Sequence, residues 1–213
     1  MRESHTIVLA SLNFDKFREM KSLLAVYPGI ELVSPEGLIR NADKIGLVEN
    51  HATYLENSAA KARLVNQGCH YPALSDDSGL EIDALGGKPG IRSHRYVKLD
   101  GYPSKISQDK ANIDKVLEEM KGKADRTARF VTSLFFVIEG IELQADGFLE
   151  GTIAEAPRGQ MGFGYDPIFV PKGEKRTLGE MTETEKNRIS HRAQALAKIM
   201  EQVKRLGIQI AKP

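Results

Sequence analysis

The chain has 213 residues, and its 30 Lys plus Arg against 29 Asp plus Glu give a formal net charge of +1. This nearly equal number of positive and negative charges excludes an overall electrostatic attraction to DNA, RNA or an anionic membrane surface. No apolar stretch is long enough to suggest a membrane span. The single cysteine, Cys69, excludes a disulfide framework within the chain and favours a reducing, cytoplasmic setting.

The chain is expected to open with a buried strand over residues 6–10, a polar turn over 11–13 and a helix from Phe14. Ser11 and Asn13 can donate side-chain hydrogen bonds at this turn, and Lys16 adds a positive charge from the first helical turn. Backbone N–H groups and the helix dipole converge there, which suits an anion. The alternative is an ordinary N-cap that only starts the helix.

The next elements are a strand over residues 30–33, a loop over 34–47 and a long helix from Glu49 to about Gln67. Glu49 stands at or just before this helix start, where the dipole stabilises a carboxylate. Asn57 and Lys61 are four residues apart and therefore share one face. The alternative for each is a place on the solvated helix surface.

Two adjacent carboxylates, Asp76 and Asp77, follow an apolar run and precede Ser78 and Gly79. The pattern predicts a corner between two short strands. Like charges so close raise one pKa or require a cation, so the pair suits a divalent metal or acid–base chemistry. The alternative is a solvated turn, because Asp, Ser and Gly all favour turns.

The second half of the chain predicts an irregular glycine-rich loop over residues 85–96, a helix over 107–120 and a long hairpin over 128–154. Phe163 then lies between two glycines, which leaves its ring little shielded, as a base-stacking residue requires. The alternative for Phe163 is a core aromatic that anchors its loop.

A last helix is expected from Thr182, which forms a capping-box pattern with Glu185. Cations gather in the first half of this helix, where they oppose the dipole and favour a bound anion. They are Lys186, Arg188, His191 and Arg192.

These features match the needs of a nucleotide: cations and N–H groups for phosphates, carboxylates for a hard metal ion, and a ring for the base. The sequence resembles the inosine triphosphate pyrophosphatase family over nearly its whole length. Six ordered segments carry the resemblance: residues 11–16, 53–57 with Lys61, 75–80, 86–90, 163–169, and Lys186 with 190–192. Leu12, Arg92 and His94 depart from the residues common in that family, which leaves the fine substrate preference open.

The resemblance implies an α/β fold in which an elongated mixed β-sheet is flanked by helices, with two lobes around a central nucleotide cleft in one domain over residues 1–213. It implies hydrolysis of ITP, dITP and XTP to the nucleoside monophosphate and pyrophosphate, with Mg²⁺ as cofactor. A cytoplasmic homodimer without DNA, RNA or membrane partners is expected.

The resemblance also assigns residues to roles. Asp77 is the implied general base, and Glu49, Asp76 and Asp77 are the implied metal ligands. The residues implied to bind the triphosphate are Ser11, Asn13, Lys16 and Lys61, with Leu12, Phe14 and Asp15 as further substrate-binding residues of the same segment. Those implied to hold the base and sugar are Ser78, Phe163, Gly164, Tyr165, Asp166, Lys186, His191 and Arg192.

Selectivity has a physical basis, because inosine and xanthosine present a 6-oxo acceptor where adenine presents an amino donor. Donor side chains therefore match the first two bases and oppose the third. Two other functions stay open: a sensor that binds nucleotides without turnover, and a pyrophosphatase for canonical or pyrimidine triphosphates, similar to Maf-like proteins.

Overall fold

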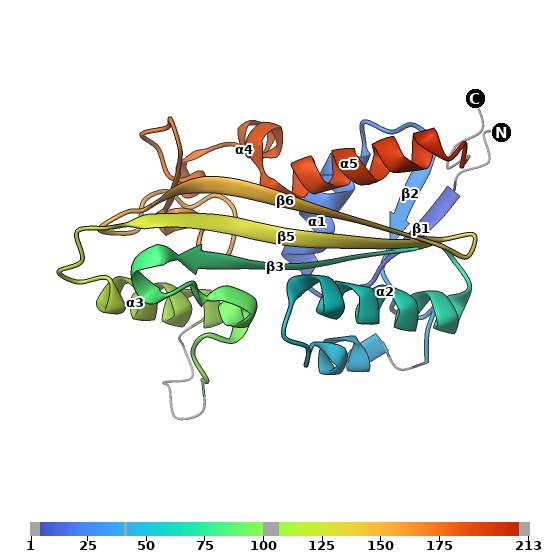
Figure 1. Ribbon diagram of the computed structural model, residues 1–213, viewed down its shortest axis with the longest axis horizontal. Coiled ribbons are helices and arrows are strands. Elements are labelled where there is room, and N and C mark those ends of the chain that lie inside the picture. Colours follow the sequence, from blue (N-terminus) through green and yellow to red (C-terminus); the bar gives the residue numbers. More distant parts are fainter. Residues whose placement is uncertain (1–4, 41, 100–106, 209–213) are drawn as a thin grey trace. The chain divides into compact units, whose positions relative to one another are not determined.

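The computed structural model describes residues 5–40, 42–99 and 107–208 (Figure 1). The strands are β1 His5–Leu9, β2 Ile30–Val33, β3 Ala73–Ile82, β4 Lys88–Pro89, β5 Thr127–Ile138, β6 Ile141–Ile153 and β7 Phe169–Pro171. The α-helices are α1 Phe14–Leu24, α2 Tyr54–Cys69, α3 Gln108–Glu119, α4 Glu183–Ile189 and α5 His191–Arg205. Short 3₁₀ turns lie between them, η1 Ala42–Val48, η2 Asp83–Leu85, η3 Gly90–Arg95, η4 Asp166–Ile168 and η5 Leu178–Glu180.

The strands form one mixed sheet in the order β2-β1-β3-β5-β6-β7, with β4 paired to β3. Strand β1 runs parallel to β2 and β3, whereas β7 runs antiparallel to β6. Strands β5 and β6 are joined by Glu139 and Gly140, both with positive φ (51° and 77°), the backbone of a two-residue hairpin turn. The expected mixed α/β sheet flanked by helices is confirmed, as is the long hairpin.

The chain divides into two compact units. The first comprises the described residues up to Asp77, Thr132–Gly147 and the described residues from Arg192 onward; the second comprises Ser78–Val131 and Phe148–His191. Strands β3, β5 and β6 contribute residues to both units.

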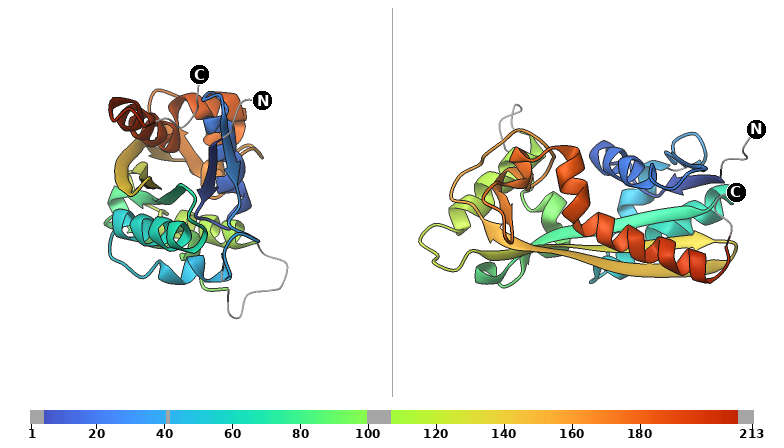
Figure 2. Two further views of the ribbon diagram at one scale, coloured as in Figure 1. Left: turned by 90° about the vertical axis from the view of Figure 1, so that its right-hand side faces the viewer. Right: turned by 90° about the horizontal axis from the view of Figure 1, so that it is seen from above.

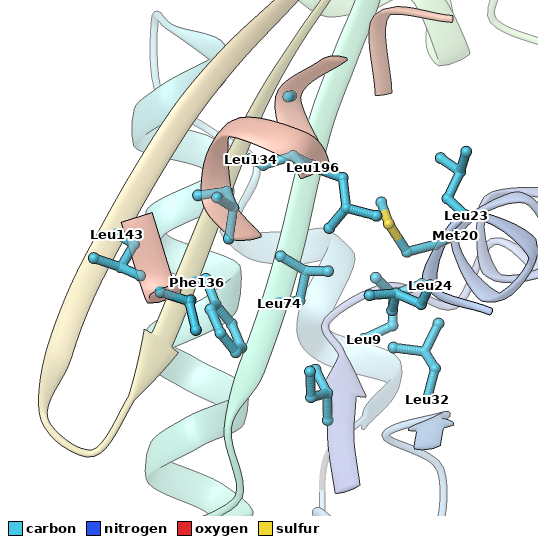
Figure 3. Packing of buried hydrophobic residues seen from close by; sticks show 14 of the residues in the cluster. Leu9, Met20, Leu23, Leu24, Leu32, Leu74, Leu134, Phe136, Leu143 and Leu196 are labelled. Carbon is cyan, nitrogen blue, oxygen red and sulfur yellow. The ribbon is translucent and has the colours of Figure 1, made fainter. Parts of the chain in front are cut away.

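In the first unit, helices cover both faces of the strands. Side chains of alternating strand residues, such as Leu9 and Leu74, pack with α1 and α5, and Figure 3 shows Met20 and Leu196 among them. The intervening residues, such as Val8 and Ala73, pack with α2 on the opposite face. This period of two is the pleat of a strand that is buried on both sides.

Helix α5 lies along β6, as the second view of Figure 2 shows. Lys198 donates a hydrogen bond to the carbonyl oxygen of Asp146 at 2.6 Å, and Gln202 donates one to the carbonyl oxygen of Gln144 at 2.9 Å. The polar face of α5 thus ties the helix to the strand beneath it, while its apolar face joins the core of the first unit.

The second unit has its own core, built from β3, α3, β5, β6 and the segment that follows β6. Its buried residues include Leu80, Val116, Phe130, Leu149 and Phe169. The rings of Phe130 and Phe169 meet at a centroid distance of 4.6 Å, within the range of favourable aromatic pairs.

Two expectations about elements were wrong. The corner predicted at Asp76 and Asp77 is absent, because β3 continues without a break for 10 residues. The last helix is two helices, α4 and α5, because Ser190 between them has extended backbone (φ −63°, ψ 148°). Tertiary packing overrides the turn preference of Ser78 and Gly79, since Leu80 and Ile82 beyond them are buried.

The start of α2 was also misplaced. The helix begins at Tyr54 with a capping box between Thr53 and Glu56, so Glu49 lies outside its first turn. None of the described helices has the length and apolar character that a bilayer crossing requires.

Candidate active site

The two adjacent carboxylates on β3 point to opposite faces of the strand. Successive strand side chains alternate, so Asp76 shares the face of Leu74, toward α1 and α5, and Asp77 shares the face of Ala73, toward α2. Both carboxylates are buried, with 1% and 7% of their surface exposed. The solvated-turn alternative is therefore excluded, and each carboxylate has its own set of partners.

Asp76 is paired with two cations. Its Oδ1 lies 2.9 Å from Lys16 Nζ of α1, and its Oδ2 accepts a hydrogen bond from Arg192 Nε of α5 at 2.7 Å. Thr132 Oγ1 on β5 adds a longer contact to Oδ2 at 3.3 Å. Burial disfavours the charged carboxylate, but Lys16 and Arg192 outweigh it and hold the pKa of Asp76 well below its usual value. Asp76 is therefore an ionised anchor for two cations.

A further buried carboxylate, Glu19, completes this side of the cluster. Glu19 Oε2 accepts a hydrogen bond from Arg192 Nη1 at 3.1 Å, and only 5% of Glu19 is exposed. Sequence reasoning missed this residue. One signal was available, because Glu19 lies four residues before Leu23 on the buried face of α1, where a charged residue is rare unless it is paired.

Asp77 belongs to a different set, supplied by α2 and the segment before it. Its Oδ2 accepts a hydrogen bond from Asn57 Nδ2 at 3.0 Å, and its Oδ1 lies 3.8 Å from Lys61 Nζ. Lys61 Nζ also donates to Glu49 Oε1 and to the carbonyl oxygen of Asp76, both at 2.7 Å. The expectation that Asn57 and Lys61 share a face is confirmed, and both are buried.

The pKa of Asp77 shifts in the opposite direction to that of Asp76. Burial raises the pKa of Asp77, the ammonium groups of Lys61 and Lys16 lower it in part, and the carboxylate of Glu49 raises it again. His51 donates its backbone N–H to Asn57 Oδ1 at 2.9 Å and so fixes the orientation in which the amide of Asn57 donates to Asp77. Asp77 is the carboxylate whose proton affinity is higher, as a base requires.

The turn before α1 is an N-cap. Asn13 Oδ1 accepts the backbone N–H of Lys16 at 3.0 Å, and Ser11 Oγ accepts the backbone N–H of Asn13 at 3.2 Å. The capping alternative is thus confirmed for Asn13. The same turn places Lys16 so that its ammonium contacts Asp76. Anion binding at this turn, in addition to capping, stays a prediction.

Leu12 of the turn and the first residues of α1 are more exposed. Leu12 and Phe14 have 45% and 73% of their surface exposed, and Asp15 lies 3.4 Å from Arg18 in a surface ion pair. Their place in substrate binding also stays a prediction.

The acidic residues suit a magnesium ion that shares its ligands with a substrate. Within residues 5–40, 42–99 and 107–208, three or more His, Cys, Asp or Glu side chains nowhere converge as a complete metal site. Magnesium needs only one or two protein carboxylates when phosphate oxygens and water complete its shell. Glu49 and Asp77 lie 2.7 and 3.8 Å from one ammonium, that of Lys61, so their oxygens are near enough to each other to share such an ion. Asp76, held by Lys16 and Arg192, fits less well.

The second unit contains the loop around Phe163. Asp166 is 3% exposed, and its Oδ2 accepts the backbone N–H of Phe163 at 2.9 Å and Lys186 Nζ at 2.7 Å. The ammonium of Lys186 lies 4.6 Å from the centroid of the Phe163 ring, within cation–π range. A Cβ on Gly162 would come within 2.0 Å of Asp166 Oδ2, so the loop requires glycine there.

Other predicted binding residues of the second unit have structural contacts. Tyr165 is buried, and its hydroxyl donates to the carbonyl oxygen of Ser93 at 2.8 Å. The His191 ring stacks on Phe130 with centroids 5.0 Å apart and planes 9° apart. Ser78 lies half-buried on β3. Phe163 is half-buried, between the fully exposed and core alternatives.

The structure separates two residues that the sequence placed together. His191 belongs to the second unit with Lys186 and Asp166, whereas Arg192 belongs to the first unit with Asp76 and Glu19. The break at Ser190 also changes how the helix dipoles act on these four cations. Lys186 and Arg188 lie in the last turn of α4, where the dipole stabilises cations, and only His191 and Arg192 lie at the start of a helix.

Comparisons with known proteins show which proteins the chain is similar to. The model of the Ham1 family matches residues 7–202. The dITP/XTP pyrophosphatase of Aquifex aeolicus is 39% identical over 203 residues, which cover 93% of this chain and 96% of that relative. The dITP/XTP pyrophosphatase of Bacillus subtilis is 42% identical over 200 residues, covering 90% and 93%. A solved HAM1 protein from Coxiella burnetii has a TM-score of 0.76 and 37% identity, covering 94% of this chain and 99% of its own.

Proposed function

Because the chain belongs to the Ham1 family, we propose that it hydrolyses ITP, dITP and XTP to the nucleoside monophosphate and pyrophosphate. The observation that carries the proposal is the pair of carboxylates on β3, of which Asp76 anchors two cations and Asp77 keeps a raised pKa. An anchored set of cations beside a basic carboxylate suits the hydrolysis of a phosphoanhydride.

Asp77 is the proposed general base. Its carboxylate accepts a proton from the attacking water, while the amide of Asn57 holds the carboxylate in one orientation. Removing that proton makes the water a stronger nucleophile toward the α-phosphorus, and the leaving group is pyrophosphate. Burial favours proton uptake by Asp77 because it raises the pKa of this carboxylate.

Lys16, Lys61 and the turn at residues 11–13 are the proposed phosphate-binding groups. Both ammonium groups are held in place by carboxylates, Lys16 by Asp76 and Lys61 by Glu49, so little side-chain entropy is lost when a phosphate binds. Arg192, which the resemblance assigns to the base and sugar, is proposed here for the phosphate end instead, because its guanidinium contacts Asp76 and Glu19.

The charge balance of the first cluster supports magnesium as the cofactor. Four carboxylates, Glu19, Glu49, Asp76 and Asp77, face three cations, Lys16, Lys61 and Arg192, which leaves one net negative charge when all are ionised. A free triphosphate carries several negative charges, so the cluster is better matched to a magnesium–triphosphate complex. Bound magnesium, held by Glu49 and Asp77, would neutralise phosphate charge as a Lewis acid.

The second unit is proposed to recognise the base. The ring of Phe163 provides a stacking surface, and Lys186 beside it is a pure donor. The 6-oxo group of hypoxanthine or xanthine can accept from such a donor, whereas the 6-amino group of adenine cannot, and a polar site rejects the mismatched base strongly. A cytoplasmic homodimer is proposed on family resemblance.

A panel of triphosphates with pyrophosphate as the readout tests the function. We expect ITP, dITP and XTP to release pyrophosphate rapidly in the presence of magnesium, and ATP to release it slowly. A preference for thymidine triphosphate would favour a pyrimidine pyrophosphatase instead. Tight binding of ITP without any pyrophosphate release would identify a sensor.

A further inference from the structure

Two carboxylates accept hydrogen bonds from consecutive backbone N–H groups of the loop that carries Phe163. The N–H of Phe163 donates to Asp166 within the loop at 2.9 Å. The N–H of the next residue, Gly164, donates at 2.8 Å to Oδ2 of Asp109, which lies on α3, 55 residues earlier in the chain. The peptide unit between the two amides therefore has a fixed place relative to both its own loop and a separate helix.

The loop needs such an external contact because its backbone has unusual freedom. Gly159, Gly162 and Gly164 all have positive φ, at 79°, 75° and 59°. Glycine pays the largest conformational entropy on ordering, so a segment with three of them has many alternative backbone states. A Cβ at Gly164 would meet nothing within 4 Å. The N–H of Met161 donates to the carbonyl oxygen of Gly179 at 2.9 Å and holds the start of the loop, and the hydrogen bond to Asp109 holds the amide of Gly164.

Helix α3 is a firm support for that hydrogen bond. The helix is packed into the core of the second unit through Val116 and through its C-cap residue Met120, which are completely buried. Asn112, 2% exposed, accepts the backbone N–H of Val97 at 2.9 Å and donates to the carbonyl oxygens of Ser93 and His94 at 3.2 and 3.1 Å. Ser93 also accepts the hydroxyl of Tyr165, which ties a second point of the same loop to this support.

Asp109 is well placed for its role on the helix. Ser107 caps α3, so Asp109 stands in the first turn, where the dipole stabilises a carboxylate. A carboxylate that accepts a backbone N–H makes a stronger hydrogen bond than a neutral acceptor. The carboxylate of Asp109, on a well-packed helix, thus holds the backbone amide of Gly164 in a glycine-rich loop.

We propose that Asp109 is a positioning residue for base recognition: by holding the amide of Gly164, it fixes the backbone under the Phe163 ring and keeps that ring beside Lys186. The proposal rests on the proposed function, in which Phe163 and Lys186 contact the base. It places the control of base binding partly on α3, whose Asp109 contacts the backbone of the loop rather than the base.

The test separates the two ends of the substrate. The product inosine monophosphate carries the base and one phosphate, and inorganic tripolyphosphate carries only the phosphate chain, so a loss of inhibition confined to inosine monophosphate reports on the base end. Asp109→Ala is expected to weaken inhibition by inosine monophosphate about 10-fold, the lower end of the loss of a charged hydrogen bond, and to leave inhibition by tripolyphosphate within about 2-fold of wild type. The KM for ITP should rise while kcat changes less.

Two variants control for general damage. Asp114→Ala removes another carboxylate of α3, which is exposed and paired with Lys110 at 2.7 Å, and should leave both inhibition constants unchanged. Asp109→Asn keeps an acceptor oxygen and should restore most of the affinity for inosine monophosphate; if the alanine variant does not fold, a selective loss of about 3-fold in Asp109→Asn is the expected result.

The proposal is overturned if Asp109→Ala leaves inhibition by inosine monophosphate unchanged, or weakens both inhibitors equally. Failure of the proposed function gives a separate result, because the wild-type protein would then release no pyrophosphate from ITP.

Discussion

Each unit of the molecule buries charged side chains, but the two clusters are built differently. In the first unit, four carboxylates and three cations form a linked network around β3, and the backbone carbonyl of Asp76 joins it. In the second unit, the pair of Asp166 and Lys186 is neutral overall and lies against the ring of Phe163. A surplus of ionic groups suits phosphates and a metal, whereas a neutral pair beside an aromatic ring suits the edge and face of a base.

The largest expected effect comes from the base of the first cluster. Asp77→Asn keeps the shape and the contact to Asn57 but removes the proton acceptor. We expect kcat for ITP to fall by about 10²–10⁴, with little change in the dissociation constant of ITP measured by calorimetry. Asp43→Asn, an exposed residue of η1, is the control. Turnover that survives in Asp77→Asn would assign the base elsewhere.

The second cluster is tested by unpairing its carboxylate. Lys186→Met leaves Asp166 buried without its ammonium partner, and breaking a buried pair in this way costs about 3–5 kcal/mol of unfolding free energy. Urea denaturation measures the loss. The double variant Lys186→Met/Asp166→Asn removes the uncompensated charge and should recover part of the stability. A loss below about 1 kcal/mol in the single variant would mean that the pair is not a buried unit.

Glu19 tests whether the first cluster acts as one network. Glu19→Gln removes one of the two carboxylates on Arg192 and is expected to lower the unfolding free energy by about 1–3 kcal/mol. Since Arg192 serves the phosphate end, kcat/KM should fall by a similar factor for ITP and XTP. Glu201→Gln, in an exposed pair with Arg205 on α5, should change stability by less than about 0.5 kcal/mol. Unequal losses between the two substrates would contradict the assignment of Arg192 to phosphate.

The smallest expected effect concerns the helix that carries Lys186. Hydrogen bonds from the backbone and the hydroxyl of Thr182 and from Arg176 lower the pKa of Glu185 to about 2, from an ordinary value of 4.5. The unfolded chain therefore binds a proton at higher pH than the folded protein, and unfolding takes up protons as the pH falls from about 4.5 to about 2. The stabilisation by Glu185 is present at neutral pH and is lost through this window.

Thermal melts of wild type and Glu185→Gln detect this loss. The difference in Tm should be small and constant above about pH 5 and should shrink as the pH approaches 2. A difference in Tm that grows as the pH falls would be opposite to this expectation and would show that the capping box is not its cause.

Local patterns were enough to predict much of the fold. The strand β2, the helix α1 and the hairpin of β5 and β6 all follow from apolar periodicity and a turn at Gly140. The continuation of β3 through Ser78 and Gly79 could not be read locally, because turn propensity there is overruled by the burial of Leu80 on the far side. The break at Ser190 has the same origin, since α4 and α5 join different cores.

The site was predictable as a set of residues but not as a geometry. Asp76, Asp77, Lys16 and Lys61 were named from the sequence, and the structure brings them together in the first unit. The different roles of the two carboxylates follow only from the strand, because successive side chains point to opposite faces. Asp76 therefore contacts Arg192, and Asp77 contacts Asn57. Their partners come from helices distant in sequence, which no local pattern could specify.

In the proposed reaction, water activated by Asp77 attacks the α-phosphorus of a non-canonical purine triphosphate. Hydrolysis of ITP in ¹⁸O-labelled water, followed by mass spectrometry of both products, tests it most directly. We expect one labelled oxygen in inosine monophosphate and none in pyrophosphate. Label in pyrophosphate, or release of orthophosphate in place of pyrophosphate, would contradict it.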